Sequence, residues 1–357
     1  MRTRVLPGVA AAAALLISGC SSGGGAPSPA PSTGTPAATA GFPVPVADCA
    51  GRETVIDGPP ARIVTSNAAA LEMLLELGAG ERVVGTGYPP GQGYLPGALA
   101  ERGARVPVLG QQGIAKEKLL GSGADLYVDT FGPMAMGGGT GAAPSEQEFA
   151  AAGIKHVFLL STACAAQGKA PRTDLAEVQR DVERLGAVTG TADRARRLTA
   201  AMAEKTGRVT AALAALPADR RPSYFFFDVD AGTKQPMAVC NRQVANAVIT
   251  LAGARNVFAD CDASFRPVGW EEVVARNPDW IQLGIRNKGG EEENRHAYEE
   301  AEQFLRTFPA TQGLAAVREG RFLRIGSEVT TIAGVRNADT VQQIARTLHP
   351  DLVKVGP

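Results

Sequence analysis

The chain has 357 residues, and its 36 basic and 36 acidic side chains give it a formal net charge of zero. This balance argues against nucleic acid or a strongly charged surface as a partner. The length allows one large or two medium-sized domains, and no segment after the N-terminal stretch is apolar enough to cross a membrane.

The N-terminus has the features of an export signal. Arg2 and Arg4 are followed by a short apolar run and then by small residues before Cys20, which predicts a signal peptide over residues 1–19. The letters "ISGC" that end at Cys20 also resemble the bacterial lipobox, in which the cysteine is lipidated and becomes the new N-terminus. The alternative is an ordinary secretory leader with a coincidental cysteine.

The segment after the leader is unsuited to folding. Residues 20–42 are rich in Gly, Ser, Pro, Thr and Ala and contain no charged side chain, so they cannot form a core. This composition is typical of a disordered tether that holds a folded body away from its anchor. We therefore expect an extracytoplasmic protein that is lipid-anchored through Cys20 to the outer face of the cell membrane.

The body alternates strand and helix patterns. In the first half, 43–172, strands are expected within 61–67 and 81–88, a helix over 68–78, and a helix followed by a strand in both 115–132 and 146–164. The second half, 217–357, repeats this order. Strands are expected within 222–230 and 316–326, a helix with a short extended piece over 246–260, a helix followed by a strand over 270–284, and a closing helix over 337–348. The alternation predicts an α/β fold with mainly parallel sheets.

A helical segment separates the two halves. Residues 173–216 are rich in Ala, Leu, Arg and Glu, with an interruption from Gly186 to Thr191, which predicts a short helix and then one long helix with Asp193 as its N-cap. A helical connector is stiff, whereas hinge crossings are short segments that absorb large backbone changes. We predict two doubly wound α/β lobes that are joined by one long rigid helix and face each other across a ligand cleft.

Four cysteines follow Cys20. Because exported chains with an even number of cysteines form disulfides, Cys49, Cys164, Cys240 and Cys261 are expected to pair, in one of three ways. We favour Cys49–Cys164 and Cys240–Cys261, because each bond then lies within one half of the body. Their spacings match no zinc signature.

The order of several segments resembles one family. They are "DCAGRETVIDGPPARIVTSNAAALEMLLELGAGERVVGTG", "KEKLLGSGADLYV", "GARNVF", "WEEVVARNPDWIQLG" and "VREGRFLRI". From about Phe42 to Leu352 the chain resembles the metal-chelate class of ABC-transporter substrate-binding proteins, which includes ferric-siderophore and cobalamin binders. The resemblance implies two lobes bridged by a long helix, no catalysis and no cofactor, and a monomer that captures a small-molecule ligand and passes it to a membrane permease.

Ligands of α/β lobes bind where loops leave the carboxyl ends of parallel strands. Aromatic side chains at such places offer rigid contact area, and arginines grip anionic or carbonyl oxygens. The alternatives are helix capping for Ser66 and Asn67, and packing for Tyr88, Phe131 and Trp270. The candidate ligand-binding residues are Ser66, Asn67, Tyr88, Gln111, Gln112, Phe131, Asp228, Asn241, Arg242, Phe265, Trp270, Arg286 and Arg336.

The three arginines in this set, Arg242, Arg286 and Arg336, favour an anionic ligand. A ferric siderophore is the first expectation, and a corrinoid or a deazaflavin-cofactor precursor comes next, the latter because "IAGVRN" and "FPVPVADCAG" are similar to an actinobacterial branch proposed to carry such a molecule. Haem is a further alternative, although no histidine or tyrosine is obviously placed as its axial ligand.

Two glutamates have a different predicted role. The resemblance implies that Glu117 and Glu271, one in each half and both near a helix start, dock the protein to its permease. The alternative is stabilisation by the helix dipole. The rival classes are an enzyme and a bare-metal binder: the chain lacks the Gly-x-Ser-x-Gly, His-Glu-x-x-His and Cys-x-x-Cys motifs, and its three histidines are too few for a histidine-rich metal site.

Overall fold

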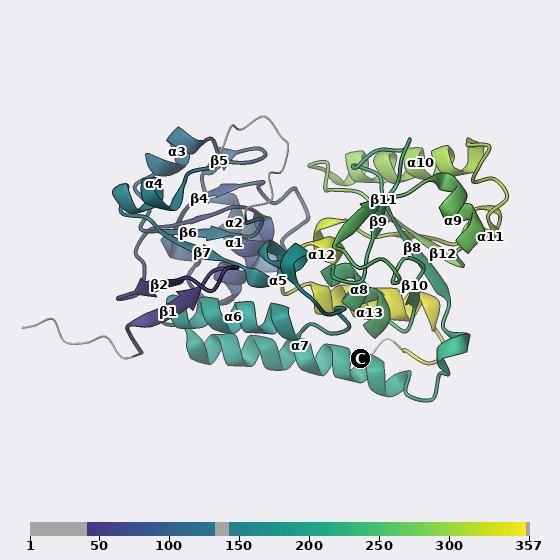
Figure 1. Ribbon diagram of the computed structural model, residues 1–357, viewed down its shortest axis with the longest axis horizontal. Helices are drawn as coiled ribbons and strands as arrows, with labels where there is room; N and C mark the ends of the chain where they lie inside the picture. Colours follow the sequence, from purple (N-terminus) through teal and green to yellow (C-terminus); the bar gives the residue numbers. More distant parts are fainter. Residues whose placement is uncertain (1–40, 133–142, 355–357) are drawn as a thin grey trace, which may run out of the picture. The chain divides into compact units, whose positions relative to one another are not determined.

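The computed structural model describes residues 41–132 and 143–354 (Figure 1). The expected signal peptide, the lipidated Cys20 and the tether up to residue 40 lie outside the described residues. The predicted α/β class is confirmed: two separate parallel sheets are present, each with helices on both faces.

The first lobe begins with an antiparallel hairpin of β1 (Val44–Ala47) and β2 (Glu53–Ile56). Its main sheet has the order β5-β4-β3-β6-β7, and all neighbours are parallel. The strand order reverses between β3 and β6. The strands are β3 (Ile63–Thr65), β4 (Val83–Gly87), β5 (Val108–Gly110), β6 (Leu126–Asp129) and β7 (Lys155–Phe158).

The helices of this lobe cover both faces of the sheet. Alternation along β3 directs Ile63 into the core that contains α1 and directs Val64 to the opposite face, where it meets α3 and α4. α1 starts where the Asn67 side chain accepts a hydrogen bond from Ala70 N at 3.0 Å. The helices are α1 (Ala68–Glu76), η1 (Gly80–Arg82), α2 (Gly97–Ala104), α3 (Lys116–Leu120), α4 (Glu146–Ala151), α5 (Leu160–Ala163) and η2 (Ala165–Gln167).

The connector consists of α6 (Ala176–Val188) and the long α7 (Ala192–Ala212), which pack against each other. Asp193 is not the N-cap of α7 as predicted, because the helix begins earlier: Ala195 N donates to Thr191 O at 3.1 Å, which makes Thr191 the N-cap. Asp193 lies in the first turn instead and forms an ion pair with Arg196.

The second lobe has a parallel sheet of order β10-β8-β12-β13, and its strand order reverses between β8 and β12. A small antiparallel pair, β9 with β11, lies beside it. The strands are β8 (Ser223–Asp228), β9 (Met237–Val239), β10 (Arg255–Asn256), β11 (Phe265–Pro267), β12 (Trp280–Gly284) and β13 (Phe322–Arg324).

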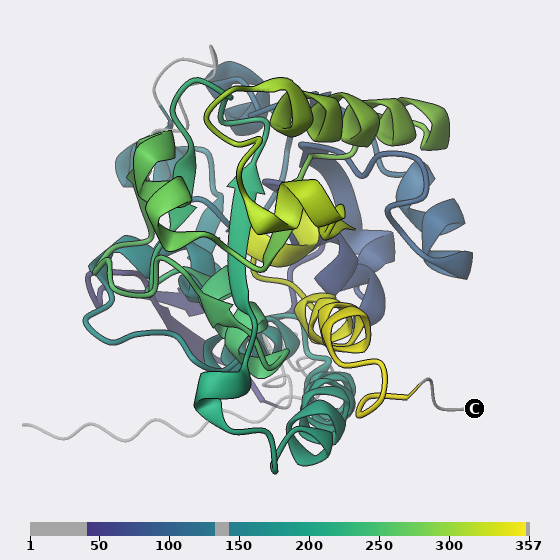
Figure 2. The ribbon, with the colours of Figure 1, turned by 90° about the vertical axis from the view of Figure 1, so that its right-hand side faces the viewer.

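Both faces of this sheet are also buried, which explains the run of aromatics in β8. Phe225 and Phe227 pack toward α9 and α10, while Tyr224 packs toward α8 and α13. In Figures 1 and 2, α13 lies beside α7, so the last helix returns to the connector. The helices are η3 (Ala218–Arg220), α8 (Val244–Leu251), α9 (Trp270–Arg276), α10 (Glu291–Thr307), α11 (Ala315–Glu319), α12 (Glu328–Thr331) and α13 (Asn337–Leu348).

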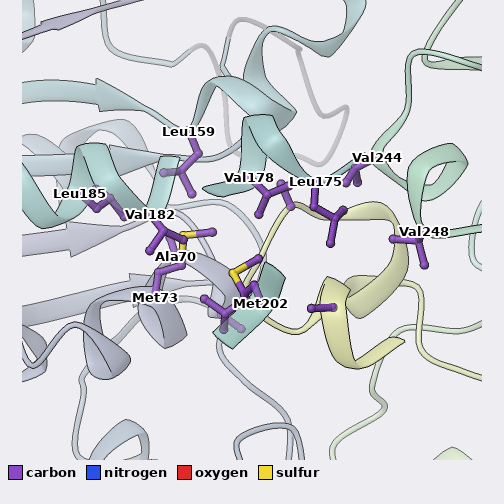
Figure 3. Packing of buried hydrophobic residues seen from close by; sticks show 14 of the residues in the cluster. Ala70, Met73, Leu159, Leu175, Val178, Val182, Leu185, Met202, Val244 and Val248 are labelled. Carbon is purple, nitrogen blue, oxygen red and sulfur yellow. The ribbon is translucent and has the colours of Figure 1, made fainter. Parts of the chain in front are cut away.

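One hydrophobic core extends through both lobes and the connector. Figure 3 shows side chains of α1, such as Met73, packed near Val182 of α6 and Met202 of α7, and the same cluster continues to Val248 of α8. Across the described ranges no helix combines the length and apolarity needed to cross a bilayer.

Both predicted disulfides are confirmed. Cys49 of the β1–β2 turn is bonded to Cys164 at the end of α5, with a Cα–Cα distance of 5.3 Å. Cys240 is bonded to Cys261 within the second lobe, with a Cα–Cα distance of 5.1 Å.

Candidate functional site

Two adjoining cavities lie between the lobes, with volumes of about 250 and about 230 Å³. They share Phe131, Arg286 and Ile332, and each is lined by residues of both lobes. We call the two cavities together the cleft. The residues that line it include Asn67, Tyr88, Tyr94, Gln111, Gln112, Asn287 and Glu328 in the first cavity and Ser161, Thr162, Asp228, Met237, Gln243, Ser264, Phe265 and Ser327 in the second.

The cleft lies at the points where the strand order of the two sheets reverses. In the first lobe, Asn67 follows β3 and Phe131 follows β6, and these two strands are neighbours at the reversal. In the second lobe, Asp228 ends β8 and Arg286 follows β12, which are again neighbours at the reversal. Loops diverge to opposite faces of a sheet at such a point and leave a crevice there.

Tyr88 forms a rigid part of the first cavity's wall. Its backbone φ is 35°, a region that bulky residues rarely adopt. Two hydrogen bonds hold it there: Tyr88 N donates to Gln112 O at 2.9 Å, and Ala68 N donates to Tyr88 O at 3.0 Å. The ring meets Phe131 edge to face, with centroids 5.5 Å apart. A strained, well-supported backbone at a cavity is typical of a functional position.

Three buried polar atoms in the cleft lack hydrogen-bond partners in the described part of the chain. They are Asn67 Nδ2 in the first cavity and the hydroxyl oxygens of Ser264 and Ser327 in the second. Because buried polar groups are nearly always hydrogen-bonded, these atoms are suited to contact polar groups of a ligand.

The charged residues of the cleft come from the second lobe. The Cζ of Arg286 lies 5.7 Å from the centroid of the Tyr88 ring. Asp228 accepts a hydrogen bond from Ala231 N at 3.3 Å, and Glu328 accepts one from Asn287 N at 2.5 Å. Burial raises the pKa of both carboxyl groups above their ordinary values, because it removes water from the charged form.

Two loops join the lobes beside the first cavity. Gln92 N donates to Gly289 O at 3.2 Å, and Asn287 Nδ2 donates to Gln92 O at 3.2 Å. Gly91 fits closely, since a Cβ at this residue would lie 2.1 Å from Asn287 Oδ1. We call residues 91–92 together with 287–289 the latch.

Eight of the thirteen sequence-predicted residues line the cleft, and five do not: Ser66, Asn241, Arg242, Trp270 and Arg336. Ser66 is buried, and its hydroxyl accepts from Thr130 N at 2.9 Å. Trp270 is buried in the second lobe's core, and its indole N–H donates to Thr233 O at 2.8 Å.

The other three bond to protein groups. Arg242 Nε donates to Asp262 at 2.8 Å, and Asn241 O accepts from Arg172 N at 2.7 Å. The guanidinium of Arg336 donates to the carbonyl oxygen of Tyr94, and its Nε lies 3.7 Å from Glu72 Oε1. Arg336 therefore bonds to Tyr94, which lines the first cavity, but itself lines neither cavity of the cleft.

Several lining residues were not predicted from the sequence, among them Tyr94, Asn287, Ser327 and Glu328. Ser327 and Glu328 follow the short strand β13, so the rule about carboxyl strand ends would have included them. Tyr94 lies seven residues beyond β4 in a loop rich in Gly and Pro, and no local pattern marks it.

The two predicted docking glutamates are exposed. Glu117 lies in the first turn of α3 and Glu271 in the first turn of α9, and the two helices belong to different lobes. Within 41–132 and 143–354, no group of three or more His, Cys, Asp or Glu side chains is arranged to hold a metal ion.

The chain is similar to proteins of one kind. The sequence profile described as "Periplasmic binding protein" matches residues 63–329. The "Uncharacterized ABC transporter substrate-binding lipoprotein YvrC" of Bacillus subtilis is 22% identical over 348 residues, which is 96% of each chain.

Solved structures share the fold. A periplasmic binding protein from Veillonella parvula has a TM-score of 0.72 at 22% identity, covering 85% of this chain and 95% of that one. A protein described as an ABC-type Fe3+-hydroxamate transport system, from Saccharomonospora viridis, has a TM-score of 0.69 at 22% identity, covering 86% of this chain and 99% of that one. The periplasmic heme-binding protein RhuT from Roseiflexus has a TM-score of 0.59 at 21% identity, covering 81% and 98%. Because the profile match extends from β3 in the first lobe to α12 in the second, the chain belongs to the periplasmic binding protein family.

Proposed function

We propose that this protein is the substrate-binding lipoprotein of an ABC importer and that it captures an iron–siderophore-type chelate in the cleft. One observation carries the proposal: the strand-order reversals of two separate parallel sheets meet at the same pair of adjoining cavities. Such an arrangement suits a ligand that both lobes contact at once. The role is binding and delivery, without catalysis.

The lining supports a bulky ligand with mixed character. Tyr88, Phe131 and Phe265 offer aromatic surface, and Arg286 and the unpartnered Asn67 amide offer donors to carbonyl or hydroxamate oxygens. The Saccharomonospora viridis neighbour is described as an Fe3+-hydroxamate transport system, which agrees with this choice. A corrinoid or a deazaflavin-cofactor precursor would use the same surfaces and is the alternative cargo.

Haem is a second candidate, and Tyr88 favours it. Tyr88 lines the first cavity, and phenolate is a known protein ligand of haem iron. A titration with haemin distinguishes haem binding from siderophore binding. Tyr88→Phe should remove the phenolate absorption band of a haem complex and should change the affinity for a siderophore little.

The proposed location of the protein is supported by its N-terminal sequence. We propose that cleavage before Cys20 and lipidation of its thiol anchor the monomer to the outer face of the membrane, with residues 21–42 as the tether. The name of the Bacillus subtilis relative includes "lipoprotein", which supports this. Labelling with a fatty-acid analogue, lost in Cys20→Ser, would test it.

Glu117 and Glu271 are proposed to dock the two lobes to arginines of the permease. Paired charges on one rim fix register and orientation. The double variant Glu117→Arg/Glu271→Arg should abolish cellular uptake and leave ligand affinity unchanged. Glu299→Arg, an exposed α10 residue, is the control. Normal uptake by the double variant would refute the docking role.

The ligand class is tested by titrating the Cys20→Ser protein with ferrichrome, cyanocobalamin and haemin while the fluorescence of Trp270 and Trp280 is recorded. Saturable quenching by ferrichrome that is lost in Tyr88→Ala/Phe131→Ala supports the proposal. Tyr298→Ala, which alters a tyrosine outside both cavities, controls for a general loss of stability. Saturable quenching by cyanocobalamin or haemin alone would replace the siderophore with that ligand in the proposal. If none of the three ligands quenches a protein that melts normally, the proposed ligand class is refuted.

A further inference from the structure

The charge balance of the cleft differs from the expectation of an anionic ligand. In the described part of the chain, three charged residues line the cavities: Arg286, Asp228 and Glu328. The ten residues 133–142, which follow Phe131 in the sequence, contain no ionisable side chain. Arg242 and Arg336, which contributed to the anionic expectation, line neither cavity and are bonded to other protein groups. The charged groups that line the cleft are therefore two carboxylates and one guanidinium.

The two carboxylates also lack the partners that other acidic groups of this lobe have. Among the described residues, no Lys or Arg nitrogen lies within 4.0 Å of Asp228 or Glu328. By contrast, Asp262 pairs with Arg242 at 2.8 Å, and Glu302 pairs with Arg324 at 2.8 Å. Burial raises the pKa of each cleft carboxyl, and the opposing charge of Arg286 does not offset that rise.

The three charged side chains are divided between the two cavities. Glu328 lines the first cavity, Asp228 lines the second, and Arg286 lines both. A ligand that fills the cleft meets a carboxylate in each cavity and the Arg286 guanidinium in both. A partly buried carboxylate without a cationic partner is costly, and a ligand cation or hydrogen-bond donor offsets that cost. A strongly anionic ligand would instead add repulsion in both cavities.

We propose, on the basis of the proposed function, that the cleft selects a neutral or cationic chelate whose periphery carries hydrogen-bond donors toward Asp228 and Glu328, and that it rejects polyanionic chelates. Ammonium, hydroxyl and amide N–H groups are suitable donors. Ferric trihydroxamates with such groups fit this description, whereas ferric tricatecholates, which are trianionic, do not. The carbonyl or hydroxamate oxygens of the accepted ligand face Arg286.

The test compares chelates that hold the same metal and differ in charge. Ferrioxamine B is cationic, ferrichrome is neutral and ferric enterobactin is trianionic. Binding to the Cys20→Ser protein is measured by calorimetry at low and at moderate salt. The expected discrimination against ferric enterobactin is on the order of 100-fold, and it decreases as salt screens the carboxylates.

Variants assign the discrimination to the two carboxylates. Asp228→Asn and Glu328→Gln should each weaken ferrioxamine B binding about tenfold and bind ferric enterobactin more tightly than the wild type does. Glu299→Gln makes the same change in net charge on exposed α10 and should change neither affinity.

The possible failures are distinguishable. Preferential binding of ferric enterobactin by the wild type, or an equal effect of Glu299→Gln and the cleft variants, would overturn this inference and leave the siderophore-binding function in place. If none of the three chelates binds to a protein that melts normally, the proposed function and this inference are both overturned.

Discussion

The guanidinium of Arg286 lies over the ring of Tyr88, with its Cζ 5.7 Å from the ring centroid. The two residues belong to different lobes, and both line the first cavity. A cation–π contact of this kind is weak where water reaches it, so a ligand oxygen can recruit the guanidinium without a large cost. Arg286 is therefore available to the ligand, whereas Arg242 and Arg336 are already bonded to other protein groups.

Of the three arginines that the sequence suggests, Arg286 should matter most for binding. Arg286→Ala should weaken ferrichrome binding by about 10- to 100-fold, the effect of losing a charge-assisted hydrogen bond. Arg242→Ala should leave the affinity within about twofold, because Arg242 bonds to Asp262 and to Ala166 O outside the cleft. Calorimetric titration measures both. A larger loss in Arg242→Ala at an unchanged melting temperature would contradict the placement of these residues.

Glu72 should make stability depend on pH. Burial raises the pKa of Glu72 from 4.5 to about 7, against an opposing effect of Arg336; Glu76, Asp339 and Lys205 also act on it. Between these two values the folded state binds more protons than the unfolded state, so the free energy of unfolding falls as pH rises. The total loss is about 3 kcal/mol, complete above pH 7.

Glu72→Gln should remove this dependence. Urea denaturation at pH 5 and pH 8 should show a smaller decrease in stability for the variant than for the wild type. Glu81→Gln, which changes an exposed residue of η1, is the control and should retain the wild-type slope. An unchanged slope in Glu72→Gln would show that this carboxyl does not titrate as the structure indicates.

The latch can be opened without altering the core. In Gly91→Ala the new methyl group would displace the Asn287 side chain, because its Cβ would lie 2.1 Å from Asn287 Oδ1. The Gln92 amide, which donates to Gly289 O, should then exchange its hydrogen about tenfold faster or more.

Hydrogen exchange with mass spectrometry measures this effect on the unliganded protein. Gly313→Ala is a matched control, because a Cβ there meets no atom within 4 Å and its φ is not positive. Equal exchange at Gln92 in Gly91→Ala and in the wild type would show that the latch does not restrain the loop.

The two disulfides should contribute unequally. In the loop-entropy account, the 115-residue separation of Cys49–Cys164 gives about 5 kcal/mol, and the 21-residue separation of Cys240–Cys261 gives about 3 kcal/mol. Paired Cys→Ser replacements, compared by urea denaturation, should follow that order. The reverse order would show that the shorter bond constrains more than chain length predicts.

The fold was largely predictable because the central strands of both sheets are largely buried on both faces and most of the helices that cover them have an apolar side. The run Tyr224–Phe227 is an example, since alternating residues face opposite layers of helices. α10 was not predicted, because within Glu291–Thr307 it buries just Ala301 and Leu305 and reads as a polar segment. The hairpin β1–β2 and the pair β9–β11 were also missed, because strands of three or four residues give too short a pattern.

The candidate site was predictable where it follows directly from strand ends. Asn67, Phe131, Asp228 and Arg286 each end or follow a strand at a reversal of strand order. Other candidate residues lie outside both cavities because a partner distant in sequence bonds to the side chain. Arg336 pairs with Glu72 and Tyr94, more than 200 residues earlier, and no local pattern reveals this.

The hydrophobic core that runs from α1 through α6 and α7 to α8 and α13 has a consequence for how the chain matures. Apolar side chains of the first lobe and the connector gain their last neighbours from Val335 to Ala345, close to the C-terminus. A partly synthesised chain is therefore expected to expose apolar side chains until α13 has been made. A lobe separated from the rest of the chain is expected to aggregate through the same side chains. Heat should unfold the two lobes in a single cooperative transition. Deletion of α13 should lower the stability of the shared core as far as α1.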